Sequence, residues 1–151
     1  MFQNALPQLL AVCGRKILKL PTPSRQDSRQ TPSSLFLFKE LETPSEYRLF
    51  FSSYRNRVLD LIRQSTHFTP LAALSQASTY VDLLTSTYGD PKAVTSRSDA
   101  AFMYWEGYSA YVEAVMLSVP EGEEEKNGQV RNVMMGMLER LLAFETTVRG
   151  N

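Results

Sequence analysis

The sequence is poor in the residues that build disulfides and metal sites. It has one cysteine, Cys13, and one histidine, His67. A lone cysteine cannot form an internal disulfide, and this one lies in a helical apolar pattern, so we expect a small buried side chain in a reducing compartment. A lone histidine with no second cysteine argues against a zinc site and is typical of a solvated turn. We therefore predict neither a metal nor a cofactor.

Long apolar runs are also missing. The stretch from Leu6 to Leu20 is interrupted by Gly14 and by basic residues, and it falls short of the 18 or more apolar residues of a membrane span. Its basic residues follow the apolar ones, which is the reverse of the order in a signal peptide. We expect an intracellular protein that makes no contact with membranes.

Patterns for nucleotide binding or catalysis are absent. The seven glycines form no phosphate-binding loop and no dinucleotide motif. Glu106 and Glu113 are seven residues apart and share a helix face, as an acid–base pair could. No metal partner or pocket accompanies them in the sequence. We expect that the protein is not an enzyme.

The net charge of zero conceals two halves of opposite sign. Residues 1–70 hold ten Lys and Arg against five Asp and Glu, whereas residues 71–151 hold six against eleven. An apolar content of 43% is that of an ordinary globular chain with one core. Overall neutrality argues against constitutive nucleic-acid binding through bulk charge.

Five segments repeat their apolar residues with the period of an α-helix, and none alternates like a β-strand. They cover residues 6–20, 44–66, 70–88, 98–117 and 130–148. The clearest start signal is the capping box Thr43-Pro44-Ser45-Glu46, and Thr69-Pro70 repeats this device. Gly89 can take the left-handed cap of the third segment. The acidic run at residues 120–125 is predicted to be a solvated loop.

The longest connection covers residues 21–44, which are rich in proline, serine and threonine. It is too long for an ordinary turn, so we predict a flexible linker in which the apolar residues 35–38 are able to dock elsewhere. Helices joined by alternately tight and long connections form bundles or α-solenoids. Both terminal helices lack a polar outer face. This favours an all-α fold, a solenoid segment of HEAT-like or armadillo-like helical hairpins spanning residues 1–151 and cut from a longer array.

Two groups of side chains are candidates for binding. Arg48, Arg55 and Arg63, together with Arg57, make the second helix basic on much of its solvent side. They could contact phosphates or an acidic partner on the inner surface of a curved array, or they could form a solvated face that pairs with nearby carboxylates. The aromatic residues of the fourth helix and the methionines of the fifth are spaced as helix interior, so we interpret them as core.

Four motifs carry a resemblance to a known family through their order along the chain. They are Leu6-Pro7-Gln8-Leu9-Leu10 with Lys16-Ile17-Leu18-Lys19-Leu20; Glu46-Tyr47-Arg48 with Phe50-Phe51 and Tyr54-Arg55; Phe102-Met103-Tyr104-Trp105-Glu106 with Tyr111-Val112-Glu113; and residues 138–146. In this order they resemble the middle of the exportin-5-like receptors, a branch of the importin-β-like nuclear transport receptor (karyopherin) family. The sequence departs from that family in its basic linker and in its acidic loop at residues 121–126.

The resemblance implies a nuclear export receptor without catalytic activity. Such receptors carry cargo, either structured RNA such as hairpin precursors and tRNA or proteins, from nucleus to cytoplasm together with Ran-GTP. The resemblance also implies nucleoporin partners and shuttling between nucleus and cytoplasm, with Ran bound by repeats that this chain does not contain. The alternatives are a segment of a tRNA exportin, or a small stand-alone helical scaffold that binds a partner protein through its basic face.

Overall fold

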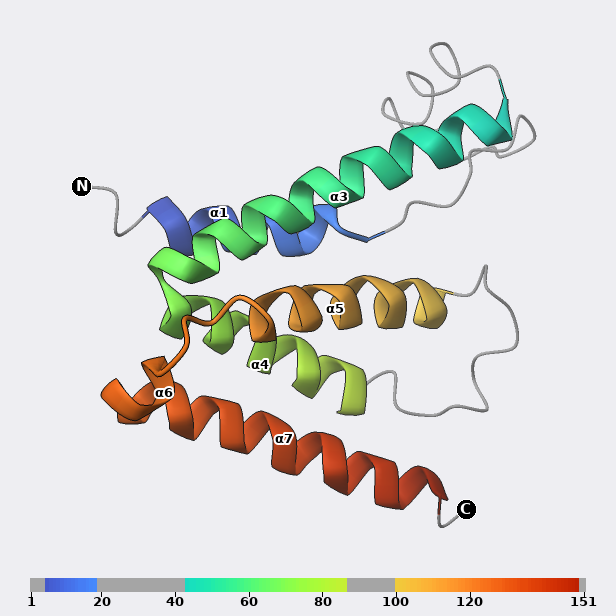
Figure 1. Ribbon diagram of the computed structural model, residues 1–151. Coiled ribbons are helices and arrows are strands. Elements are labelled where there is room, and N and C mark those ends of the chain that lie inside the picture. The colour runs from blue at the N-terminus through green and yellow to red at the C-terminus, as the bar shows by residue number, and fades with distance from the viewer. Residues whose placement is uncertain (1–4, 19–42, 87–99, 150–151) are drawn as a thin grey trace.

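The computed structural model describes residues 5–18, 43–86 and 100–149 (Figure 1). Within these ranges the chain forms α1 (Ala5–Lys16), α3 (Pro44–Phe68), α4 (Pro70–Ser86), α5 (Ala100–Met116), α6 (Glu123–Lys126) and α7 (Gly128–Arg149). The described residues contain no strand, which confirms the all-α prediction. The predicted linker lies outside the described residues except at its end, where α3 begins. The predicted glycine cap of the third segment also lies outside them.

The start of α3 is fixed by local hydrogen bonds, as predicted. The Thr43 hydroxyl accepts a hydrogen bond from the backbone N–H of Glu46 at 3.2 Å, and the Thr43 N–H donates to the Glu46 carboxylate at 2.9 Å. Pro44 occupies the first turn, where its missing N–H costs nothing. These contacts complete the capping box.

One local prediction was wrong, and another was confirmed in its position. Helix α4 begins after Thr69, as predicted, and the Ala73 N–H donates to the Thr69 carbonyl at 3.1 Å. The Thr69 hydroxyl donates to the carbonyl of Ser65 at 3.0 Å and so closes the last turn of α3. The acidic run is not entirely a loop, because α6 forms a helical turn after Gly122, whose φ of 76° is the left-handed conformation that glycine favours. Asn127 then caps α7 by accepting a hydrogen bond from the Gln129 N–H at 3.0 Å.

The long helices stack in three layers, and consecutive ones run in opposite directions (Figure 1). The pair α1 and α3 forms one outer layer, the pair α4 and α5 forms the middle, and α7 forms the other outer layer. Helix α4 lies at the centre, where it packs on α1, α3, α5 and α7. The described chain is therefore a stack of antiparallel helical hairpins.

One hydrophobic core runs through all three layers. Every long helix contributes fully buried apolar side chains to it, among them Leu10, Ile17, Ile62, Leu74, Tyr111, Val130 and Met137. Close helix packing depends on two glycines. A Cβ on Gly14 of α1 would overlap the ring of Tyr80 of α4, and a Cβ on Gly107 of α5 would lie 2.7 Å from a methyl carbon of Leu18. Glycine at both positions allows α1 to approach the middle layer.

Candidate partner-binding face

Two of the three candidate arginines lie on the open surface of α3. Arg48 is exposed, and its Nη2 donates a hydrogen bond to the Ser45 hydroxyl at 3.3 Å. Arg63 is exposed and pairs with Asp60, with 2.7 Å between Nη1 and Oδ1. Both partners lie one turn away on α3 itself. The pairing of Arg63 with Asp60 is one that the solvated-face interpretation expects, and both guanidinium groups remain accessible to a partner.

Arg55 is in different surroundings, because its side chain reaches across to the middle layer. Its Nη1 lies 3.1 Å from the Glu106 carboxylate, and its Nη2 donates to the Glu106 backbone carbonyl at 2.7 Å. The Arg55 side chain is only 15% exposed. Arg55 therefore joins α3 to α5. The three arginines do not form one open surface, and their contact with a partner stays a prediction.

Glu106 and Glu113, the two carboxylates that could form an acid–base pair, lie in different environments. Glu106 is held by Arg55 on the side of α5 that faces α3. Glu113, two turns further along α5, is exposed. The ion pair with Arg55 therefore gives Glu106 a structural role, and no catalytic role is needed to account for a carboxylate at this position.

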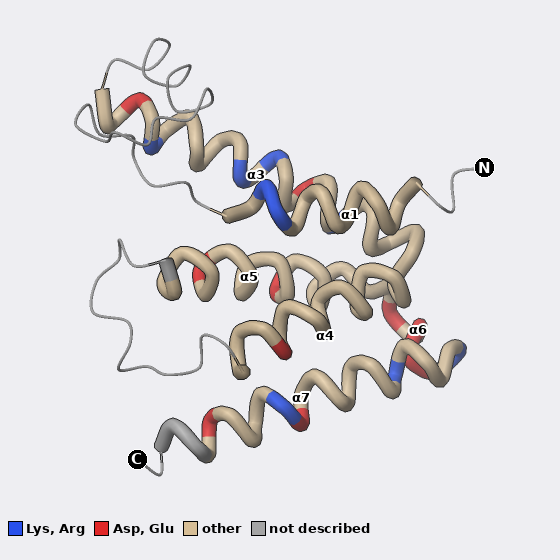
Figure 2. The backbone as a smooth tube through the Cα atoms, turned by 180° about the vertical axis from the view of Figure 1, so that it is seen from behind, with Lys and Arg blue, Asp and Glu red and all other residues tan. Residues whose placement is uncertain are grey.

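Further basic residues on the same layer were not predicted as a group. Arg15 and Lys16 end α1 and are exposed, and Arg57 is exposed on α3. Figure 2 shows the basic end of α1 beside the basic middle of α3, two helices that pack on each other. The sequence alone gives no sign of this juxtaposition because it depends on how α1 packs. Basic residues in a last helical turn also interact favourably with the helix dipole.

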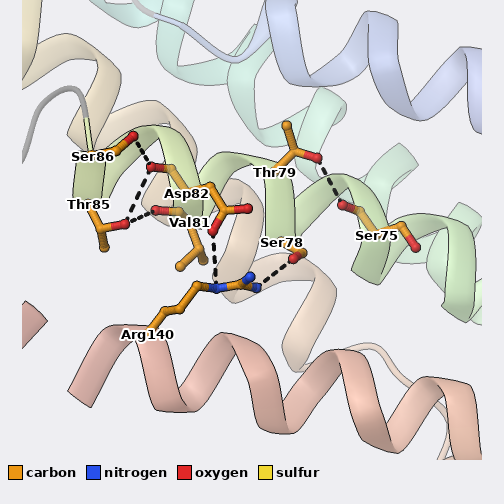
Figure 3. A network of polar contacts seen from close by, with 8 residues as sticks. All are labelled: Ser75, Ser78, Thr79, Val81, Asp82, Thr85, Ser86 and Arg140. Carbon is orange, nitrogen blue, oxygen red and sulfur yellow. Dashed lines mark hydrogen bonds and ion pairs between the residues drawn. The ribbon is translucent and has the colours of Figure 1, made fainter. Parts of the chain in front are cut away.

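A second polar cluster joins α4 to α7 and was missed by sequence reasoning (Figure 3). The Arg140 Nη2 donates a hydrogen bond to the Ser78 hydroxyl at 2.6 Å, and its Nε lies 3.1 Å from the Asp82 carboxylate. The Nε–H does not point at that oxygen, so this second contact is ionic rather than a hydrogen bond. Asp82 and Arg140 are 58 residues apart in the sequence, and only the packing of α7 reveals the pair.

The other hydroxyls in this cluster are used within α4. Thr79 and Thr85 donate to carbonyls four residues earlier, at 3.1 and 2.9 Å, and Ser86 does the same at 2.6 Å (Figure 3). Such bonds satisfy the hydroxyls locally. The Ser78 hydroxyl differs from these, because it accepts a hydrogen bond from Arg140 of α7.

As predicted, Tyr108 and Tyr111 of α5 are buried in the core, and Tyr104 and Trp105 pack against it. The same prediction was wrong for Met135 of α7, which is 50% exposed. Tyr80 of α4 stacks on Tyr108 with 4.2 Å between ring centroids and meets Tyr111 edge to face at 4.9 Å. Tyr111 is fully buried. Burial raises the pKa of Tyr80 to about 12, with a smaller contribution from Tyr108, and it raises the pKa of Tyr111 above its ordinary value as well. These hydroxyls stay protonated at physiological pH.

The tyrosine cluster predicts a loss of stability in alkali. Because the folded chain holds the Tyr80 proton up to about pH 12 and an unfolded tyrosine titrates near 10, unfolding releases protons between these values. The contribution of Tyr80 to the free energy of unfolding should be constant well below pH 10 and fall as the pH rises through 10 towards 12. Urea unfolding at pH 9, 10 and 11 measures this. A stability that is unchanged at pH 11 would contradict it.

Replacing Tyr111 with Phe should stabilise the protein. The Tyr111 hydroxyl is buried and has no hydrogen-bond partner among the described residues. Removing it relieves the desolvation cost of a buried polar atom, so we expect a gain of about 1 kcal/mol in urea unfolding. The control is Tyr80→Phe, because the Tyr80 hydroxyl is not among the buried atoms of the described residues that lack a partner, so its removal should bring no gain. Equal effects of the two substitutions would sink the prediction.

The single cysteine and the single histidine show no sign of a binding or catalytic role in the structure. Cys13 is buried, as predicted, and burial raises the pKa of its thiol. His67 is exposed near the end of α3, with its ring against that of Phe68. No three metal-ligating side chains gather in the ranges that the structure describes. No described helix is both long and apolar enough to cross a bilayer.

Comparison with protein-family models identifies a match over most of the chain. The family model of the Exportin-5 family matches residues 1–148. No curated protein and no solved structure matches the chain significantly. The match covers nearly the whole sequence and therefore includes all the motifs that carried the resemblance.

Proposed function

We infer that this chain, which belongs to the Exportin-5 family of nuclear export receptors, forms part of the wall of such a receptor. The family match over residues 1–148 carries the proposal. Antiparallel helical hairpins stacked in layers fit the HEAT-like solenoid of the karyopherins, in which each repeat contacts only its neighbours. On this proposal the receptor binds cargo and carries it out of the nucleus, and it catalyses no reaction.

The partners follow from the same proposal. Cargo is structured RNA or protein, held together with Ran-GTP, and the complex passes nucleoporins on its way from nucleus to cytoplasm. A stack of helix pairs bends easily, so Ran and cargo can be coupled through its curvature. Ran is assigned to repeats outside this chain, and the exposed basic residues of α1 and α3, which do not include Arg55, are assigned to cargo.

Nucleotide-dependent capture tests this function. The full-length protein carrying this sequence is immobilised and offered Ran locked in its GTP or GDP form, together with hairpin RNA or total cellular protein. We expect cargo to be retained with GTP-bound Ran and released with the GDP form. Equal retention in both states, or none in either, would remove the export function while leaving the fold unchanged.

The open arginines of α3 should contribute to cargo affinity. Arg48→Glu with Arg63→Glu in the full-length protein should weaken RNA binding and reduce the slope of log affinity against log salt by about two, because each arginine would neutralise one phosphate. Arg131→Glu on α7 is the matched control, since it reverses one exposed arginine away from α3. Affinity and slope that match the unaltered protein would argue against contact with these residues.

A further inference from the structure

Threonine followed directly by proline recurs along this sequence. Four of the eight prolines follow a threonine, and three of these pairs continue into serine, at residues 22–24, 31–33 and 43–45. The structure describes two of the four pairs, Thr43-Pro44 and Thr69-Pro70, and the other two lie outside the described residues. Both described pairs open a helix, where proline is favoured. The two threonines nevertheless lie in different surroundings.

Thr43 is open to solvent at the start of α3. It is exposed, and its backbone is extended, with a φ of −126° and a ψ of 152°. The following proline favours this conformation, because it disfavours a helical backbone in the residue before it. The Thr43 hydroxyl accepts a hydrogen bond from the Glu46 N–H at 3.2 Å. Helix ends fray, so an enzyme that binds an extended segment can reach this hydroxyl.

Thr69 is enclosed by the turn between α3 and α4. It is half-buried, and its hydroxyl donates to the Ser65 carbonyl at 3.0 Å. Its backbone is engaged on both sides, since its N–H donates to the Ser65 carbonyl at 2.9 Å and its own carbonyl accepts from the Ala73 N–H at 3.1 Å. The same dipeptide is therefore held closed here, and the turn would have to unfold before an enzyme could reach its hydroxyl.

The position of Thr43 is the edge of the stack and not one of its two end faces. In a solenoid, neighbouring repeats pack against the helix faces, and the ends of the helices remain at the edge. Helix α3 begins beyond the end of α1, as Figures 1 and 2 both show. A further repeat packed on α1 and α3 therefore leaves the first turn of α3 accessible.

We propose that Thr43 is a phosphorylation site for a proline-directed protein kinase and that Thr69 is not. Such a kinase takes its acceptor from an extended segment and has a pocket for the proline that follows, and Thr43-Pro44 meets both requirements. The Thr43 hydroxyl oxygen bonds to the γ-phosphorus of a nucleoside triphosphate, the bond from that phosphorus to its bridging oxygen breaks, and the nucleoside diphosphate leaves. The hydroxyl proton passes to the catalytic carboxylate of the kinase. The inference does not rest on the export function.

A phosphate on Thr43 would find a cation within the first turn of α3. It would carry a charge of about −1.5 to −2 at the end of the helix where the dipole favours anions. Arg48 reaches back over this turn, with its Nη2 donating to the Ser45 hydroxyl at 3.3 Å, and a phosphate is the stronger acceptor. The Glu46 carboxylate, which accepts from the Thr43 N–H at 2.9 Å, would be repelled. Phosphorylation thus exchanges the capping box for a pair between the phosphate and Arg48.

Phosphate mapping on the full-length protein carrying this sequence tests the site. The folded protein is incubated with a proline-directed kinase and ATP, and phosphopeptides are quantified by mass spectrometry. We expect phosphate on Thr43 and none on Thr69, whereas synthetic peptides of residues 38–50 and 64–76 should both be phosphorylated. Pro44→Ala should slow the reaction at Thr43 by roughly tenfold or more, because the kinase pocket loses its proline. A folded protein without phosphate on Thr43, or with equal phosphate on both threonines, overturns the proposal.

The rate of phosphate removal tests the pairing with Arg48. In the phosphorylated protein, Arg48→Ala should speed the release of phosphate from Thr43 by a phosphatase about two- to fivefold, the protection that an exposed ion pair gives. Arg63→Ala is the matched control, because Arg63 lies further along α3 and pairs with Asp60, so this variant should release phosphate at the unaltered rate. Equal rates for the two variants would show that Arg48 does not hold the phosphate.

Discussion

Arg55→Glu is expected to lower the free energy of unfolding by roughly 2–3 kcal/mol. The substitution removes the cation that joins α3 to α5 and sets a second carboxylate against Glu106. Removing one partner of a buried ion pair costs about 3–5 kcal/mol, and the Glu106 side chain is 38% exposed, so solvent reduces that figure here. Urea unfolding followed by circular dichroism measures the loss.

The matched control for this substitution is Arg63→Glu. It makes the same change on the same helix, but Arg63 pairs with Asp60 within α3, and the two side chains are 47% and 63% exposed. An exposed pair of this kind is worth about 1 kcal/mol at most. Arg55→Glu combined with Glu106→Arg should recover part of the loss by restoring the attraction. If Arg55→Glu is no more costly than Arg63→Glu, the proposed link between layers is wrong.

This comparison decides how binding data on α3 are interpreted. A variant at Arg55 that loses cargo affinity would do so through a shifted α3, because the guanidinium group is turned towards α5. Variants at Arg48 and Arg63 leave the layers joined. A loss of cargo affinity in variants at Arg48 and Arg63 would therefore indicate direct contact with cargo. A loss in a variant at Arg55 would instead indicate that the helices α3 and α5 have shifted.

Local features of the fold were predictable because their causes lie close together in the sequence. The capping box needs only Thr43 and Glu46, three residues apart, and both hydrogen bonds form as expected. The period of α5 predicted that its aromatic residues are core, and Tyr111 is fully buried. Local reasoning placed the start of α4 at Thr69-Pro70 correctly, but it did not predict that the Thr69 hydroxyl also donates to the Ser65 carbonyl of α3.

The candidate site was predictable only in part because its partners are distant in the sequence. Charge on α3 identified the arginines, but the partner of Arg55 lies 51 residues away on α5, and the partners of Arg140 lie on α4. No periodicity indicates which arginine turns inward. The role of Gly14 was not predictable for the same reason. A glycine within a helical pattern usually indicates a less stable helix, whereas here it allows close contact between α1 and Tyr80 of α4.

Gly14→Ala is expected to destabilise the protein by about 2 kcal/mol, although alanine is the better helix former. The added Cβ would overlap the Tyr80 hydroxyl and lie 2.6 Å from the ring carbon that bears it. Tyr80 has little room to retreat, because it is stacked on Tyr108 and meets Tyr111 edge to face. Helix α1 must therefore move away from α4 and bury less of its apolar surface in the core.

The control for Gly14→Ala is the same substitution in the open part of another helix. A Cβ on Gly136 of α7 would meet no atom within 4 Å, so Gly136→Ala should stabilise the protein by about 0.5–1 kcal/mol through helix propensity. Combining Gly14→Ala with Tyr80→Phe should recover part of the loss, since the hydroxyl oxygen is removed while the ring carbons remain. Opposite signs for the two glycines in urea unfolding are the expected result. A gain from Gly14→Ala would show that α1 does not pack on Tyr80 as closely as this arrangement requires.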